Sequence, residues 1–181
     1  MRSRAWAWAW SGAAAGALAV LLVLPPQAQA QSLETAVKAT YLYKFAPFVE
    51  WPTKAFETST SPLTVCVQGD DPFGPLLDRA IAGQKIGTHP VQARRLDIVD
   101  AASGCHIVFV SGSKRQPQGE ALKALRGSGA LTVTDGGGGA IRFVMQNDRV
   151  RFEIDTGEAS SDGLTLSSKL LSLAVNARPR P

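Results

Sequence analysis

The segment 33–52 combines a helical spacing of apolar residues with a high density of aromatic rings. Its apolar side chains recur every four residues, at Leu33, Val37, Tyr41 and Phe45. This spacing predicts an amphipathic helix, and a helix with so many rings needs a surface on which to pack. We expect Val37, Tyr41 and Phe45 to serve the protein's own core.

The ends of this helix carry residues with clear capping and breaking preferences. Ser32 is the expected N-cap, because its hydroxyl can accept a hydrogen bond from a free backbone amide of the first turn. Pro47 should kink or end the last turn, since proline has no amide hydrogen, and Pro52 should stop the helix. Phe48 and Trp51 therefore lie at the end of the helix.

Residues 1–30 have the pattern of a secretory signal peptide. Arg2 and Arg4 precede an apolar run over 13–24, and the triplet 28–30 is a small-x-small cleavage site, so the mature chain should begin at Gln31. The alternative is an uncleaved membrane anchor, but the apolar run is short for a bilayer span. We expect an exported mature chain without membrane insertion.

Residues 31–181 are long enough for one domain with a sizeable core. The net charge of +4 for the whole chain falls to +2 when Arg2 and Arg4 are removed. No basic run follows, so the composition gives no support to nucleic-acid binding.

Strand and helix patterns alternate along this part of the chain. Strands are predicted over 63–68, 91–96, 107–110, 131–134, 140–145 and 149–154, and helices over 76–82, 119–125 and 165–174. Asp71 and Pro72 should start the first of these helices, 146–148 should form a hairpin turn, and 176–181 should be a frayed tail. The prediction is a single α/β domain with a mixed central sheet flanked by helices, ending in an antiparallel hairpin and a C-terminal helix.

The two cysteines, Cys66 and Cys105, both lie in the expected mature chain. In an oxidising compartment an even number of cysteines favours a disulfide, and the alternative is a pair of buried free thiols. Zinc is not expected, because only His89 and His106 could join the cysteines and no metal-ligand spacing is present.

None of the chemical motifs in the chain has the context that its chemistry needs. The glycines of 135–139 are followed by a strand pattern and not by a helix, so they predict a connector and not a phosphate loop. Ser111 and Lys114 match Ser-x-x-Lys but follow a strand, and Glu153 and Asp155 are best interpreted as a solvated strand face. We predict no catalytic, cofactor-binding or metal-binding residues.

An ordered set of segments resembles the YfiR family of periplasmic proteins. The segments are 37–52, 63–67, 104–110, 141–143, 150–155 and 163–174. None of them is very specific alone, but together they cover nearly all of residues 31–181.

This resemblance implies a non-enzymatic regulator in the periplasm that uses no cofactor. Its partner would be the periplasmic domain of an inner-membrane diguanylate cyclase or related sensor, through which it would control cyclic-di-GMP signalling and biofilm formation. The family is also associated with dimers and with disulfide control. Cys66 and Cys105 look like one family pair, whereas a second pair is missing from 140–155, which puts redox switching in doubt.

Four residues are candidates for partner binding. Phe48 and Trp51 are candidate aromatic anchors at the helix end, and core packing against the sheet is the favoured alternative for either one alone. Glu158 and Leu164 resemble positions in a family loop linked to partner control. The alternative function is a periplasmic small-ligand-binding protein, or an enzyme without a cyclase partner. Its ligand should bind outside the carboxyl ends of the parallel strands, near 69–70 or 111–112.

Overall fold

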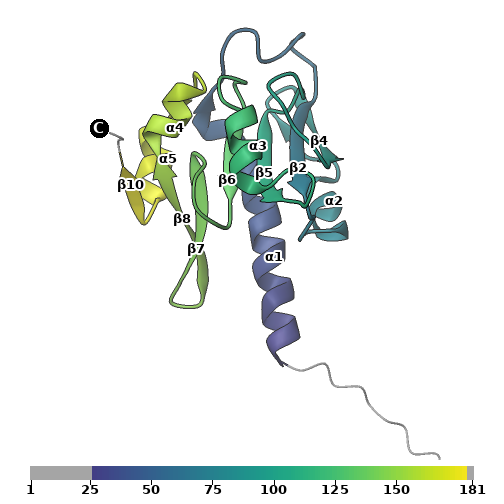
Figure 1. Ribbon diagram of the computed structural model, residues 1–181, viewed down its shortest axis with the longest axis vertical. Coiled ribbons are helices and arrows are strands. Elements are labelled where there is room, and N and C mark those ends of the chain that lie inside the picture. The colour runs from purple at the N-terminus through teal and green to yellow at the C-terminus, as the bar shows by residue number, and fades with distance from the viewer. Residues whose placement is uncertain (1–25, 179–181) are drawn as a thin grey trace, which may run out of the picture.

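The computed structural model describes residues 26–178 (Figure 1). Its main element is an eight-stranded mixed sheet with the order β10-β8-β7-β6-β5-β2-β4-β3. The strands are β2 (Leu63–Gly69), β3 (Lys85–Ile86), β4 (His89–Leu96), β5 (Ile107–Gly112), β6 (Leu131–Thr134), β7 (Ile141–Gln146), β8 (Arg149–Asp155) and β10 (Asn176–Arg178). A separate two-stranded sheet pairs β1 (Val49–Glu50) with β9 (Thr165–Leu166).

Helices cover both faces of the main sheet. They are α1 (Pro26–Lys44), the 3₁₀ helix η1 (Ala46–Phe48), α2 (Pro75–Ile81), α3 (Gln118–Ala124), α4 (Thr156–Ser161) and α5 (Ser168–Leu173). Val65 and Val67 of β2 pack in one core cluster with α1 and α2, whereas Cys66 between them packs in a second cluster with α3. This alternation is the two-residue period of a strand buried on both faces. The predicted single-domain α/β fold with a mixed sheet is confirmed.

The aromatic helix differs from its prediction at both ends. It already begins at Pro26, so Ser32 lies inside the helix and the predicted N-cap is wrong for the full chain. It ends at Lys44, and Pro47 lies within η1. Leu33 is 67% exposed, because the first turns of α1 extend beyond the sheet (Figure 1).

The three predicted core residues of this helix all pack against the core, but they are buried to different extents. Phe45 is 1% exposed, while Val37 and Tyr41 are half-buried and pack against the core. The tightest part of the helix interface also includes Ala39 and Leu42, both fully buried. The predicted cleavage after residue 30 would remove the first five residues of α1. It stays a prediction, and residues 1–25 lie outside the described part of the chain.

The glycine-rich segment 135–139 is a connector between β6 and β7, as predicted. These neighbouring strands are parallel, yet few residues join them. The register explains this, because Val133 pairs with Ile141 and β7 therefore starts beside the end of β6. The chain therefore passes directly from the end of β6 to the adjacent start of β7. Gly138 and Gly139 allow this sharp change of direction with φ of 84° and 80°.

The predicted hairpin is formed by β7 and β8. Asn147 and Asp148 connect them with φ of 51° and 56°. Left-handed values at both central residues are typical of the two-residue turn that matches the twist of antiparallel strands.

Three other predictions fail near element ends. The C-terminal helix contains only Ser168–Leu173, because Thr165 and Leu166 form β9. The expected frayed tail is wrong for Asn176–Arg178, which pairs with β8 in parallel. Asp71 does not cap α2; its carboxylate accepts a hydrogen bond from the Phe73 amide, and the helix starts later, at Pro75.

Candidate functional site

The small β1–β9 sheet brings the end of the aromatic helix next to the C-terminal part of the chain. Val49 pairs with Leu166, and the Ser167 amide donates a 2.9 Å hydrogen bond to the Phe48 carbonyl. We call the surface formed by residues 48–51, α4, β9 and α5 the β1–β9 corner. The four candidate partner-binding residues all belong to this corner or to the loop between α4 and β9.

The two aromatic candidates are half-buried. The Nζ atom of Lys169 lies 5.8 Å from the ring centre of Phe48. The ring of Trp51 stands edge-on to Phe56 at 6.4 Å and to His106 at 5.8 Å. Both aromatic rings therefore pack partly against the protein and leave part of their surface open.

The two loop candidates have different environments. Glu158 is half-buried in the first turn of α4, where its amide donates a 3.0 Å hydrogen bond to the Asp155 carboxylate. Leu164 is 3% exposed and belongs to the core, so any role in partner control has to act through the shape of its loop. The partner-binding role of all four residues stays a prediction.

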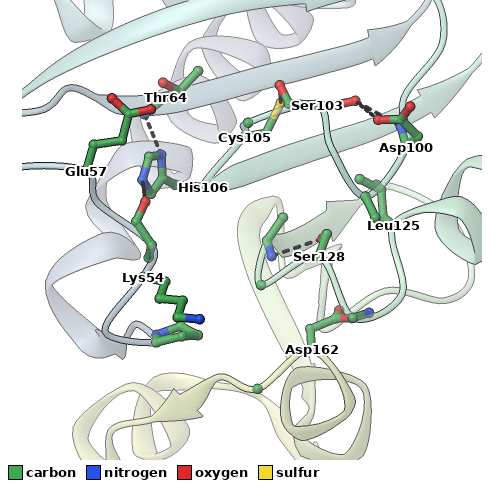
Figure 2. Close-up of a pocket in the computed structure, with 18 of the residues that line it drawn as sticks. Lys54, Glu57, Thr64, Asp100, Ser103, Cys105, His106, Leu125, Ser128 and Asp162 are labelled. Carbon is green, nitrogen blue, oxygen red and sulfur yellow. Dashed lines mark hydrogen bonds between the residues drawn. The ribbon is translucent and has the colours of Figure 1, made fainter.

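A cavity of about 740 Å³ lies beside the corner, at the amino ends of β2, β5 and β6. Its wall comes from the connector 52–62, Thr64 of β2, the loop before β5, the loop after α3, and residues 161–163. Figure 2 shows the charged residues around it: Lys54, Glu57, Asp100 and Asp162. This wall is part polar and part apolar, and its three carboxylates outnumber its single lysine.

The disulfide between Cys66 and Cys105 crosses one side of this cavity. It joins β2 to the residue just before His106, with a Cα–Cα distance of 5.9 Å. Cys66 is fully buried, whereas Cys105 is half-buried and lines the cavity. The predicted pairing is confirmed, and the bridge fixes the start of β5 against β2.

Asp162 lies on the opposite wall, at the end of α4, and is only 6% exposed. Burial raises the pKa of its carboxyl above the ordinary value, since a desolvated carboxylate is disfavoured. The Gly127 amide opposes this effect with a 2.7 Å hydrogen bond, while the negative charge of Glu158 adds to it.

The expected ligand position at the carboxyl ends of the parallel strands is wrong, because protein groups fill it. The side chain of Gln68 is fully buried there and accepts a hydrogen bond from the Gly112 amide. Its amide group donates to the carbonyls of Asp97 and Gln116. The Asp70 amide also donates to the Gly112 carbonyl, which closes the space between the two loops.

The remaining motifs have structural partners. The Ser113 hydroxyl accepts hydrogen bonds from the amides of Arg115 and Gln116 in the loop that contains the Ser-x-x-Lys match. Glu153 pairs with Arg142 across the β7–β8 hairpin. Within residues 26–178, no cluster of three or more side chains suited to a metal ion is found. No helix in the same range is long and apolar enough to cross a membrane.

The sequence analysis did not predict the cavity or the stack that the rings of Phe56, His89 and His106 form beside it. In the sequence, His106 stands next to an apolar strand pattern and Phe56 lies in a polar segment without any periodicity. The stacked residues are far apart in the chain, so no local spacing in the sequence predicts that their rings are in contact. An aromatic residue in an otherwise polar connector was the one available signal.

A comparison with protein families matches residues 35–175 to a family described as YfiR/HmsC-like. The match covers more than half of the chain and includes the corner, the disulfide and most of the sheet. No curated protein is similar enough to the chain to count as a match.

Proposed function

We propose, from the premise that the chain belongs to the YfiR/HmsC-like family, that it binds the periplasmic domain of an inner-membrane diguanylate cyclase and holds the cyclase inactive. The family comprises periplasmic regulators of cyclic-di-GMP signalling. Through this partner the protein would restrain biofilm formation. It acts by binding and not by catalysis, in the periplasm, after its signal peptide has been removed.

The observation that carries this proposal is the composition of the β1–β9 corner. Phe48, Trp51, Leu166 and Leu171 are half-buried there, and Leu173 is 50% exposed. Glu50, Glu158 and Lys169 are charged residues of the same corner, and the ammonium group of Lys169 lies over the ring of Phe48. An apolar centre with a polar rim is the usual anatomy of a protein–protein interface.

The test is a binding measurement between the secreted chain and the purified periplasmic domain of its cognate cyclase. We expect Trp51→Ala to weaken binding about tenfold or more, which corresponds to about 1.4 kcal/mol or more. Glu158→Gln should weaken binding less, because it keeps the size of a half-buried side chain at the rim and removes its negative charge.

Leu33→Ala is a matched control, since this apolar side chain is 67% exposed on α1, away from the corner. It should bind as the wild type does. Wild-type affinity in a folded Trp51→Ala variant would remove Trp51 from the interface. No binding by the wild-type chain would overturn the cyclase partner itself.

The cavity beside the corner favours a second candidate function, a periplasmic small-ligand-binding protein or an enzyme without a cyclase partner. A volume of about 740 Å³ is within the range of small-molecule sites. Native mass spectrometry of the chain isolated from a periplasmic extract would detect a retained small molecule. Ala101→Trp should displace it, because Ala101 is an exposed wall residue and the indole would fill part of the space.

A further inference from the structure

The imidazole of His106 is held in one neutral tautomer by two backbone groups. The Thr64 amide donates a 3.1 Å hydrogen bond to Nδ1, so this nitrogen carries no proton. Nε2 lies 2.8 Å from the Ala55 carbonyl, which can only accept, so the proton is on Nε2. The ring therefore fastens the connector 52–62 to the start of β5.

A second histidine fastens the other end of the connector. The Nδ1 atom of His89 lies 2.7 Å from the Ser61 carbonyl and donates to it. Between the two imidazoles lies the ring of Phe56, stacked on His89 at 3.9 Å and on His106 at 4.3 Å. Trp51 stands edge-on to both Phe56 and His106, so its position depends on this stack.

Protonation of His106 is incompatible with this arrangement. A proton on Nδ1 would face the Thr64 amide hydrogen, and the hydrogen bond between them would be replaced by a repulsive contact. Burial lowers the pKa of His106 below the ordinary value of 6.5; the Ala55 carbonyl opposes this, and the positive charge of His89 adds to it.

The cavity offers the charged ring a better position. Lys54 and Glu57 of the connector line it together with His106, and Asp100 and Asp162 line it from two other loops. Figure 2 shows Glu57 on the same side as the imidazole. Three carboxylates and one ammonium group give this space a net negative charge, which favours an imidazolium ion.

We propose that His106 is an acid-sensitive latch on the connector 52–62. Neutral His106 holds the connector and Trp51 in place; protonated His106 turns toward the cavity, the Ala55 contact is lost, and Trp51 leaves its aromatic neighbours. If the proposed function holds, this release changes the corner that meets the cyclase, so the latch makes partner binding depend on external acidity.

The direction of the pH dependence follows from the lowered pKa. A histidine that is harder to protonate in the folded chain stabilises the fold at pH values above 6.5. That contribution is lost as the pH falls through the lower pKa of the folded state. The transition should therefore have its midpoint below pH 6.5.

The test uses the secreted chain alone, without any partner. Trp51 is the sole tryptophan of residues 31–181, so its fluorescence reports on the corner directly. Between pH 7.5 and 4.5 we expect its emission to move to longer wavelength in one step with a midpoint below 6.5. A parallel NMR titration should show His106 gaining its Nδ1 proton with the same midpoint, while far-UV circular dichroism stays constant.

Two variants serve as matched controls. His106→Gln can keep both backbone contacts without titrating, and it should abolish the step. His89→Gln removes the neighbouring charge, and it should move the midpoint to higher pH. Superimposable profiles for the wild type and His106→Gln would overturn the latch. If His106→Gln does not fold, an NMR titration of the wild type without any accompanying change at Trp51 would overturn it equally. Either result is independent of whether the cyclase binds.

Discussion

The backbone amide of Gly127 donates a 2.7 Å hydrogen bond to the carboxylate of Asp162. This contact joins the loop after α3 to the end of α4, two segments that lie side by side in the cavity wall beside the β1–β9 corner. Asp162 thus combines a useful hydrogen bond with the cost of a buried charge.

Asp162→Asn should be at least as stable as the wild type at pH 7. The pKa of Asp162 is raised in the folded chain, so the fold favours the protonated acid and loses stability as the pH rises from 3.8 through the folded pKa. Asparagine keeps the acceptor oxygen without the charge. Urea unfolding at several pH values should show that the stability gain of Asp162→Asn over the wild type becomes smaller toward acid pH. Asp162→Ala removes the acceptor and should cost about 1 kcal/mol.

The parts of the fold that the sequence predicted are those with strong local signals. Ile107 to Val110 form an uninterrupted apolar run, and the hairpin has two alternating strands around a turn. β10 was missed because its residues carry no strand pattern and pair with β8 only through the tertiary fold. The two-residue strands β1 and β9 are too short to show a period. The leucines that follow Leu164 have a helical spacing, so they predicted a helix longer than α5.

The site was less predictable than the fold for a similar reason. The disulfide and the aromatic helix end were predicted, because for cysteine and for aromatic residues the residue type alone indicates the interaction it tends to make. The ligand position failed because the buried amide of Gln68 closes the carboxyl ends of the strands, and a single glutamine in a strand gives no warning of this role. The cavity is lined mainly by small loop residues, and such residues follow no spacing rule that a sequence could reveal.

Replacing both cysteines by alanine should lower the free energy of unfolding by about 4 kcal/mol. The disulfide between Cys66 and Cys105 spans a sequence separation of 39, and its loss frees that loop in the unfolded chain. Guanidinium unfolding of the double variant should match that of the reduced wild type. Serine at position 66 should cost more than alanine, because Cys66 is fully buried and a hydroxyl would need a partner there. Equal stability of oxidised and reduced chains would contradict this prediction.

Arg95→Lys should weaken the attachment of α2 to β4 by up to about 1 kcal/mol. The guanidinium group of Arg95 contacts both oxygens of Asp78 at 2.7 and 2.8 Å, and it also reaches Asp71 at 3.1 Å. Lysine cannot reproduce this fork. The effect of Arg95→Lys is measured by thermal unfolding of the variant and of the wild type at pH 7.

The same contact predicts a pH dependence. The hydrogen bond from Arg95 lowers the pKa of the Asp78 carboxyl below 3.8, so its stabilisation is present above pH 3.8 and lost as the pH falls through the folded pKa. The difference in the free energy of unfolding between the wild type and Arg95→Lys should therefore become smaller as the pH falls below 3.8. Arg115→Lys is the control, since Arg115 makes one exposed contact with Asp97, and its effect should be close to zero. An equally large effect at both arginines would contradict the role of the fork.

Gly69→Ala should destabilise the fold strongly although it adds only one methyl group. Gly69 has a φ of 80°, and a Cβ atom there would lie 2.2 Å from the carbonyl oxygen of Gly112. That oxygen accepts the Asp70 amide hydrogen, so it cannot withdraw without breaking a contact that closes the carboxyl ends of β2 and β5. Backbone strain and overpacking together should cost on the order of 3 kcal/mol.

Gly119→Ala provides the matched comparison in the same fold. Gly119 lies in α3, and its added Cβ would meet no atom within 4 Å. Alanine also has the better helix propensity, so this variant should gain up to about 0.5–1 kcal/mol. Urea unfolding of both variants should therefore move the midpoint in opposite directions. Wild-type stability in Gly69→Ala would mean that β2 and β5 can separate at this point, and the closed end of the sheet would then be open to a ligand after all.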